Sequence, residues 1–306
     1  MTKLGTSDLD VFPLCLGGNV FGWTADEQSS RAVLDAYTAA GGNFIDTADV
    51  YSSWVPGHSG GESETIIGNW LGARPDRDAL IVATKVGHNR DLRREAILEG
   101  ARRSLERLQT DHIDLYYMHN DDLDTPFEES LGAFAELVRD GRVRYVGASN
   151  FTAERLAEAL TVAEREGLPA PVALQNEYNL ITRDYEHGPE QVVAESGLAA
   201  VPYYGLASGF LTGKYRPGGD AVDSPRAQGA LERLDAHGLA VLDALDEIAS
   251  EHDASVAAVA LAWLAAQPTV VAPIASARTV EQLDELLAFT TLALAPDELD
   301  RLSQAG

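Results

Sequence analysis

The sequence predicts an α/β protein with the (β/α)₈ (TIM) barrel fold, and three observations carry that prediction. The chain has 306 residues, 45% of them hydrophobic, which suits one large globular domain spanning residues 1–306. Short apolar segments alternate with amphipathic segments of helical period along the whole chain, and eight such strands are the number in this barrel. The glycine-rich turn at residues 16–22 lacks the G-x-G-x-x-G spacing of a doubly wound dinucleotide-binding sheet.

The predicted elements follow one another in a regular order. Residues 4–11 are expected to form a hairpin that caps the barrel, with its turn at residues 6–8. Strands are predicted at residues 14–16, 43–45, 79–83, 113–117, 143–147, 172–174, 199–202 and 270–273. Helical periodicity marks residues 93–108, 126–138, 153–166, 239–248 and 256–265. The stretch 206–231, rich in Gly and Pro, predicts a mobile functional loop.

Composition narrows the function classes. A net charge of −25 repels phosphate backbones and anionic lipid, so we expect neither nucleic-acid nor membrane-surface binding. The single cysteine, Cys15, allows no internal disulfide, and with no secretory signal we expect a cytoplasmic protein. The acidity is compatible both with arginine-favouring codon usage and with adaptation to high salt. Lysine occurs only at Lys3, Lys85 and Lys214, so a lysine inside a site is conspicuous.

Ionisable residues stand at the ends of three successive predicted strands or just after them. Asp46 and Tyr51 follow the second strand, Lys85 the third and His119 the fourth. Because strand ends meet at one mouth of a barrel, these side chains are expected to converge there. A tyrosine hydroxyl can protonate a carbonyl oxygen while hydride arrives at the carbon, and a neighbouring ammonium should lower its pKa from about 10. Asp46 would then hold Lys85 in place, and His119 would hydrogen-bond the substrate oxygen.

The same residues lie in recognisable motifs. Asp46-Thr-Ala-x-x-Tyr51, Thr84-Lys85 and Tyr117-Met-His119 resemble the catalytic tetrad motifs of the aldo-keto reductase superfamily. Segments 141–151, 175–179 and 209–215 resemble the branch that includes bacterial sugar-type oxidoreductases and potassium-channel β-subunit-like proteins. The resemblance implies NADPH, with NADH as a second possibility, bound in an extended pose across the barrel mouth. It also implies reduction of a small aldehyde, ketone or keto-sugar.

The resemblance further assigns residues to the cofactor. It places three side chains on the nicotinamide carboxamide and one aromatic ring against the nicotinamide, namely Ser149, Asn150, Gln175 and Tyr203. It places six more along the pyrophosphate, the 2′-phosphate and the adenine: Leu206, Ser208, Lys214, Arg278, Gln282 and Glu285. Four positions depart from the family pattern: Tyr204 and Gly205 replace a common Ser-Pro, Leu286 a common Asn and Ser276 a common Gly.

The substrate side is less constrained by the sequence. Trp23 and Trp54 follow the first two strands and are expected to wall the pocket, whereas His58 and His88 are expected to face solvent. No metal site is expected, because Lys85 would oppose a cation beside Asp46, which disfavours a metal-dependent barrel hydrolase. A nicotinamide-nucleotide-sensing regulatory subunit with vestigial reductase activity is the remaining alternative. The sequence carries no signal for the oligomeric state.

Overall fold

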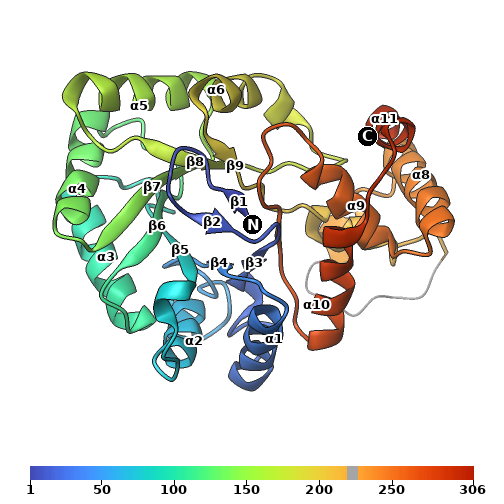
Figure 1. Ribbon diagram of the computed structural model, residues 1–306, viewed down its shortest axis with the longest axis horizontal. Helices are drawn as coiled ribbons and strands as arrows, with labels where there is room; N and C mark the ends of the chain where they lie inside the picture. The colour runs from blue at the N-terminus through green and yellow to red at the C-terminus, as the bar shows by residue number, and fades with distance from the viewer. Residues whose placement is uncertain (219–226) are drawn as a thin grey trace.

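The computed structural model describes residues 1–218 and 227–306, and it confirms the barrel (Figure 1). Within these residues, eight parallel strands form one curled sheet in the order β10-β3-β4-β5-β6-β7-β8-β9. The strands are β3 (Cys15–Gly17), β4 (Phe44–Asp46), β5 (Ile81–Val86), β6 (Ile113–Met118), β7 (Val143–Ser149), β8 (Pro171–Gln175), β9 (Ala199–Ala200) and β10 (Ile274–Ala275). Most begin or end within two residues of their predicted bounds.

The last strand is the one that the sequence misplaces. Residues 270–273 were expected to be regular strand, yet only Val270 forms a bridge, with Ala200 of β9. On the other side, Pro273 O accepts from Cys15 N (3.0 Å) and β10 pairs with β3. Proline has no N–H to donate, so Pro273 contributes only its carbonyl oxygen to this ladder. Ile274 N still donates to Pro202 O, just after β9 (2.8 Å), so the segment closes the barrel by bonding to both of its neighbours.

A two-stranded antiparallel hairpin precedes the barrel, as expected. Its strands are β1 (Thr2–Lys3) and β2 (Asp10–Val11), so its first strand starts before the predicted residues 4–11. Leu4 N donates to Leu9 O (2.9 Å), which makes the whole stretch between them the turn. Leu4, Leu9 and Val11 are buried against the barrel interior and cover its amino-terminal end. The opposite end, where the strands finish, is left for the site.

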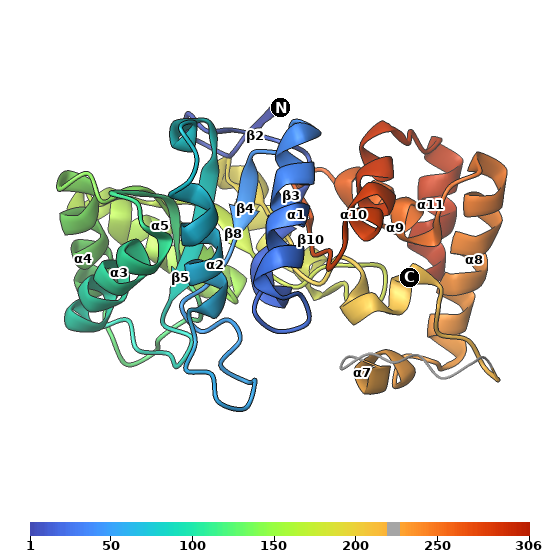
Figure 2. The same cartoon turned by 90° about the horizontal axis from the view of Figure 1, so that it is seen from below.

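Helices surround the strands, and Figure 2 shows α8 to α11 gathered on the side opposite α3 to α5. They are α1 (Glu27–Ala39), α2 (Glu62–Leu71), α3 (Arg94–Leu108), α4 (Phe127–Arg139), α5 (Ala153–Glu166), α6 (Pro189–Ser196), α7 (Ala227–Leu231), α8 (Ala236–His252), α9 (Val256–Ala265), α10 (Val280–Leu287) and α11 (Pro296–Ala305). Side-chain caps fix several of their first turns: Asp26, Thr152, Asp235, Ser255 and Thr279 each accept from a backbone N–H three residues on. None of these helices is long and apolar enough to cross a membrane.

The predicted loop at residues 206–231 contains more regular structure than expected. It includes a 3₁₀ segment, η4 (Ala207–Thr212), and the short helix α7. Residues 219–226 lie outside the described part of the chain. Phe210 and Leu211 of η4 are buried in the main core, so this part of the loop is anchored by its apolar side chains.

Candidate functional site

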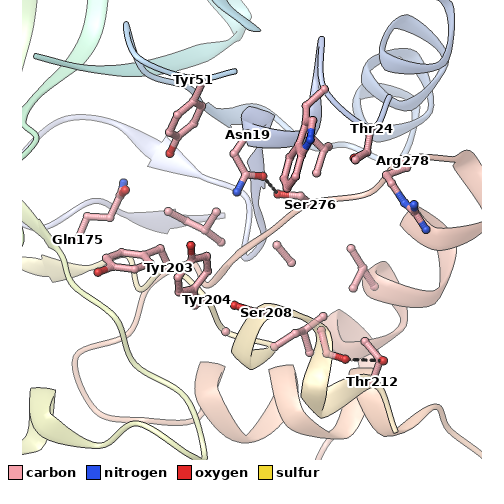
Figure 3. Close-up of a pocket in the computed structure, with 18 of the residues that line it drawn as sticks. Asn19, Thr24, Tyr51, Gln175, Tyr203, Tyr204, Ser208, Thr212, Ser276 and Arg278 are labelled. Carbon is pink, nitrogen blue, oxygen red and sulfur yellow. Dashed lines mark hydrogen bonds between the residues drawn. The ribbon is translucent and has the colours of Figure 1, made fainter. Parts of the chain in front are cut away.

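A cavity of about 650 Å³ opens at the carboxyl ends of the strands (Figure 3). It runs past the ends of β6, β7 and β8, the loops after β3, β4 and β9, and the start of α10. The predicted site residues that line it are Trp23, Tyr51, Trp54, His119, Ser149, Asn150, Gln175, Tyr203, Leu206, Ser208, Lys214, Arg278, Gln282 and Glu285. The remaining two, Asp46 and Lys85, are buried behind Tyr51.

Lys85 is the centre of a compact hydrogen-bonded group. Its ammonium lies 2.6 Å from Asp46 Oδ2, 2.7 Å from Thr47 O and 2.9 Å from Tyr51 Oη. The side chains of Lys85 and Asp46 are each 1% exposed. Because an ammonium has three N–H donors, all of them are used. The Tyr51 oxygen accepts from Lys85, so its own proton points either to Asp46 Oδ2 (3.3 Å) or into the cavity.

The acidity of Tyr51 differs from the sequence-based expectation. Lys85 was expected to lower the pKa of this hydroxyl, but burial and then the Asp46 carboxylate raise it well above 10. Burial is the main reason, because it disfavours the charged phenolate, and the Asp46 carboxylate at 2.6 Å from Lys85 offsets the charge of the ammonium that would otherwise favour it. In this structure Tyr51 is therefore a protonated hydroxyl, the form that a proton donor needs.

His119 follows the last residue of β6 and is held there by its backbone, because its N–H donates to Val86 O (2.7 Å). Burial lowers its pKa to about 2, with further lowering from Lys85 and His88. The ring is therefore neutral, with one nitrogen able to donate and the other to accept. Nδ1 is buried and has no hydrogen-bond partner among the residues described. A neutral imidazole beside Tyr51, with ring centroids 6.3 Å apart, can hydrogen-bond a carbonyl oxygen.

Amide and hydroxyl side chains connect this group to the middle of the cavity. Gln175, at the end of β8, donates from Nε2 to Asp46 Oδ1 (2.9 Å), and Ser149 Oγ donates to Gln175 O (2.7 Å). Asn150 has φ +58° and donates to His119 O (2.8 Å), while its Oδ1 accepts from Tyr203 Oη (2.7 Å). A non-glycine residue in this conformation is uncommon, and here the two side-chain bonds fix it. The structure thus brings Ser149, Asn150, Gln175 and Tyr203 together, as predicted.

Two cations mark the part of the cavity away from Tyr51. Figure 3 shows Arg278 at the far side, next to the start of α10. Neither Arg278 nor Lys214 forms an ion pair with any described carboxylate, although acidic residues outnumber basic ones two to one. Arg278 N instead donates to Gln282 Oε1 (3.0 Å), which ties the arginine to the first turn of α10. Free guanidinium and ammonium groups beside a helix N-terminus suit phosphate oxygens.

The sequence analysis missed several residues of the cavity wall. Asn19, after β3, accepts through Oδ1 from Ser276 Oγ (2.8 Å), a bond between the two ends of the chain (Figure 3). The rule applied to later strands, asking what each presents at its end, would have found Asn19 at the first. His88 is exposed as expected, but it also lines the cavity with its ring 4.8 Å from that of His119. Asn120 fixes His88 by donating to its carbonyl oxygen (2.7 Å).

The two tryptophans predicted for the substrate side, Trp23 and Trp54, lie on the side of the cavity that holds Tyr51. Their rings meet edge to face with centroids 5.5 Å apart, and Trp54 is 6.1 Å from the ring of Tyr51. Trp54 is 47% exposed, so it stands at the rim of the cavity. His58 lies in the same loop after β4, is exposed and does not line the cavity.

Comparisons with known proteins identify the family of the chain. Residues 13–306 match the model of the aldo/keto reductase family. The chain is 35% identical to the uncharacterized oxidoreductase YrpG of Bacillus subtilis, covering 99% of this chain and 94% of that protein. It is 33% identical to protein tas of Escherichia coli, covering 97% of this chain and 94% of that protein. It is 34% identical to a probable voltage-gated potassium channel subunit beta of rice, Oryza sativa, covering 98% of this chain and 94% of that protein.

Proposed function

The chain belongs to the aldo/keto reductase family of oxidoreductases, and we propose that it reduces the carbonyl group of a small aldehyde, ketone or keto-sugar with NADPH, Tyr51 being the proton donor. One observation carries this proposal: a protonated Tyr51 hydroxyl lines the cavity and accepts a hydrogen bond from a buried lysine at 2.9 Å. The neutral ring of His119 lies beside it. This is the arrangement that proton transfer to a carbonyl oxygen requires.

The residues of the cavity suit a nicotinamide nucleotide. At one end, the oxygen of the Gln175 amide and one lone pair of Ser149 Oγ can accept from a carboxamide, since Ser149 Oγ donates to Gln175 O and accepts from Asn150 Nδ2, and Gln175 Nε2 donates to Asp46. Tyr203 offers an aromatic face whose position is set by Asn150. At the other end, Lys214 and Arg278 offer two unpaired cations for phosphates. When bound, the reduced nicotinamide supplies hydride to the carbonyl carbon.

The chain's own residues supply the rest of the reaction. His119 donates a hydrogen bond to the substrate oxygen and orients it toward Tyr51. As negative charge develops on that oxygen, Tyr51 transfers its proton to it and becomes a phenolate. The Lys85 ammonium, already bonded to Tyr51 Oη, stabilises this phenolate, and Asp46 keeps Lys85 in place. The product is an alcohol, and a proton from solvent restores Tyr51.

We prefer NADPH to NADH because of Arg278. Its guanidinium has no carboxylate partner in the described parts of the chain, and its backbone is anchored by Gln282. A fork of N–H donors fits the oxygens of a 2′-phosphate, which NADH lacks. Leu286 also lines this end of the cavity, but its side chain has no polar atom, so the preference for NADPH depends mainly on Arg278.

Replacing Tyr51 by Phe tests the mechanism. Tyr51→Phe removes only the hydroxyl, so carbonyl reduction should fall by about 10²- to 10⁴-fold, as expected for loss of a general acid. NADPH binding, measured by quenching of tryptophan fluorescence, should remain close to wild type because the cofactor residues are untouched. A variant that keeps near-normal turnover would disprove the role of Tyr51. Failure of the wild type to bind either nucleotide would disprove the reductase proposal itself.

The similarity to the rice protein named as a potassium channel subunit keeps a second role in view. Under it, slow chemistry would report the redox state of the nucleotide pool to a partner. The complete group of Asp46, Tyr51, Lys85 and His119 favours turnover instead. Negligible turnover on a broad carbonyl panel, together with a protein partner captured only in the presence of nucleotide, would reverse that preference.

A further inference from the structure

The rings around Tyr51 and His119 form one connected wall at this end of the cavity. The centroid of His88 lies 4.8 Å from that of His119, and Tyr51 lies 6.3 Å from His119. On its other side, Tyr51 is 6.1 Å from Trp54, which in turn is 5.5 Å from Trp23. We call these five residues the ring wall. It surrounds the position at which a substrate carbonyl would meet Tyr51.

The ring wall offers no fixed charge to a substrate. Among the described residues that line the cavity, Lys214, Arg278 and Glu285 carry charge, and all three belong to the loop after β9 or to the segment around α10. Lys85 is buried behind Tyr51 and is neutralised by Asp46 at 2.6 Å. His119 is neutral because burial disfavours its charged form.

An anionic substrate would therefore lose more free energy of hydration at this wall than it gains in contacts with it. A carboxylate or phosphate that enters it gives up its hydration, and no cation of the wall replaces that hydration. A flat apolar group, by contrast, gains contact area against the rings, and Trp54 is 47% exposed and free to be covered. The net charge of −25 also disfavours the approach of anions.

Like the two tryptophans, His88 belongs to the ring wall but not to the proton-transfer group, and it is the wall residue beside His119. It follows β5, its backbone is held by Asn120 Nδ2 (2.7 Å), and its side chain is exposed beside His119. We propose that the ring wall selects uncharged carbonyl compounds with a flat apolar group and rejects those carrying a carboxylate or phosphate, with His88 as a specificity-determining residue. This inference rests on the proposed reductase function.

A matched pair of substrates tests the selectivity. Methyl 4-formylbenzoate and 4-carboxybenzaldehyde share the ring and the aldehyde and differ in the para group, which is a neutral methyl ester in one and a carboxylate in the other. The assay is done at mildly alkaline pH, where an imidazole is neutral. With the wild-type protein and NADPH, kcat/KM for the ester should exceed that for the acid by at least about tenfold, since a desolvated charge is left unpaired.

Replacing His88 by Lys tests the residue. An ammonium beside His119 should raise the ratio of kcat/KM for the acid to that for the ester by about tenfold or more, because it supplies the missing cation. Taking the ratio between the two substrates cancels any general loss of activity. His58→Lys is the matched control: it adds the same charge to an exposed loop position outside the cavity, and the ratio should stay that of the wild type.

Two outcomes would overturn the inference. One is efficient reduction of the acid by the wild type, and Arg90→Ala would then show whether that exposed arginine, two residues after His88, supplies a cation. The other is an unchanged ratio in His88→Lys, which would remove His88 from specificity. Binding of the corresponding benzyl alcohols, followed by tryptophan fluorescence, gives the preference without turnover. An ester preference in binding with no reduction of either aldehyde would support the inference and contradict the proposed reductase function alone.

Discussion

Lys85 shows how one buried residue holds the proposed catalytic group together. Its ammonium binds acceptors from three directions, and its side chain is 1% exposed. A charge so far from water is tolerated only because Asp46 lies at 2.6 Å and the remaining N–H donors are satisfied. Asp46 in turn has both oxygens bonded, one by Lys85 and the other by Gln175. The pair thus fixes the positions of Tyr51 and Gln175 more than it stabilises the fold.

Removing only one member of a buried ion pair leaves the other charge unpaired, so we predict that Lys85→Met destabilises the protein strongly. It leaves the Asp46 carboxylate buried without its counter-ion, which costs about 3–5 kcal/mol in comparable buried pairs. Urea denaturation would measure the change in the free energy of unfolding. Lys3→Met is the matched control, since Lys3 pairs with Asp10 on the surface, where both side chains are 58% exposed and the expected cost is at most about 1 kcal/mol. Equal effects of the two substitutions would contradict the buried-pair argument.

The loop from β4 to α2 carries a second, partly buried carboxylate between Asp46 and Tyr51, that of Asp49. Asp49 N donates to Lys85 O (3.3 Å), while its Oδ1 is buried and has no hydrogen-bond partner in the described structure. It faces Glu64 of α2, whose carboxylate accepts from Thr84 Oγ1 (2.5 Å) and Arg107 Nε (2.6 Å). Burial, and next the charge of Glu64, raise the pKa of Asp49 to about 7. Arg107 is thus the cation that interacts with both Asp49 and Glu64, next to the loop that carries Tyr51.

Asp49→Asn should stabilise the protein in a pH-dependent way. With a pKa of about 7 in the folded chain against 3.8 ordinarily, the folded state binds more protons between these values, so stability falls as pH rises through that window. The amide removes this loss, and the Tm gain of the variant should grow from about pH 4 to pH 7 and then level off. Scanning calorimetry at several pH values measures it. Asp300→Asn, at an exposed position of α11, should show no such trend. A gain that does not depend on pH would mean that Asp49 is ionised throughout.

At the scale of the whole molecule, the acidic surface and the cationic end of the cavity act in opposite directions. The net charge of −25 produces a long-range repulsion toward an anionic nucleotide. Lys214 and Arg278 act only over short distances, once the phosphates have entered the cavity. Under the proposed function, the cofactor would approach against the overall electrostatic field of the protein and be retained by contacts with these two cations.

This division predicts a salt dependence of cofactor association. Added salt screens the distant surface charges first, so the association rate constant for NADPH should rise by about two- to tenfold between low and moderate ionic strength. The rise should be smaller for NADH, which carries one phosphate group fewer. Stopped-flow quenching of tryptophan fluorescence measures both rates. A rate that falls with salt would show that the two local cations, rather than the surface, govern the approach.

The sequence by itself determined the alternation of strands and helices, and with it the barrel. It also placed the polar residues near the strand ends, because parallel strands of a barrel all finish at one mouth. That rule requires only the positions of the strand ends along the chain, without any distance between atoms. It was sufficient to predict that Tyr51, His119 and Gln175 lie at the same cavity, whereas Arg278 was assigned there only through the resemblance to the family.

The tertiary structure decided what depends on burial and on contacts between distant segments. The pKa of Tyr51 rises rather than falls, first because the hydroxyl is buried and next because the Asp46 carboxylate is close, and the sequence reveals neither the burial nor the distance. The same holds for His88, which the sequence assigns to solvent and the fold sets against His119. Barrel closure at residues 269–275 depended on which neighbours this segment meets, and the Asn19–Ser276 bond joins residues 257 positions apart. Local pattern specifies the elements, whereas charge, acidity and pairing follow from packing that only the folded chain creates.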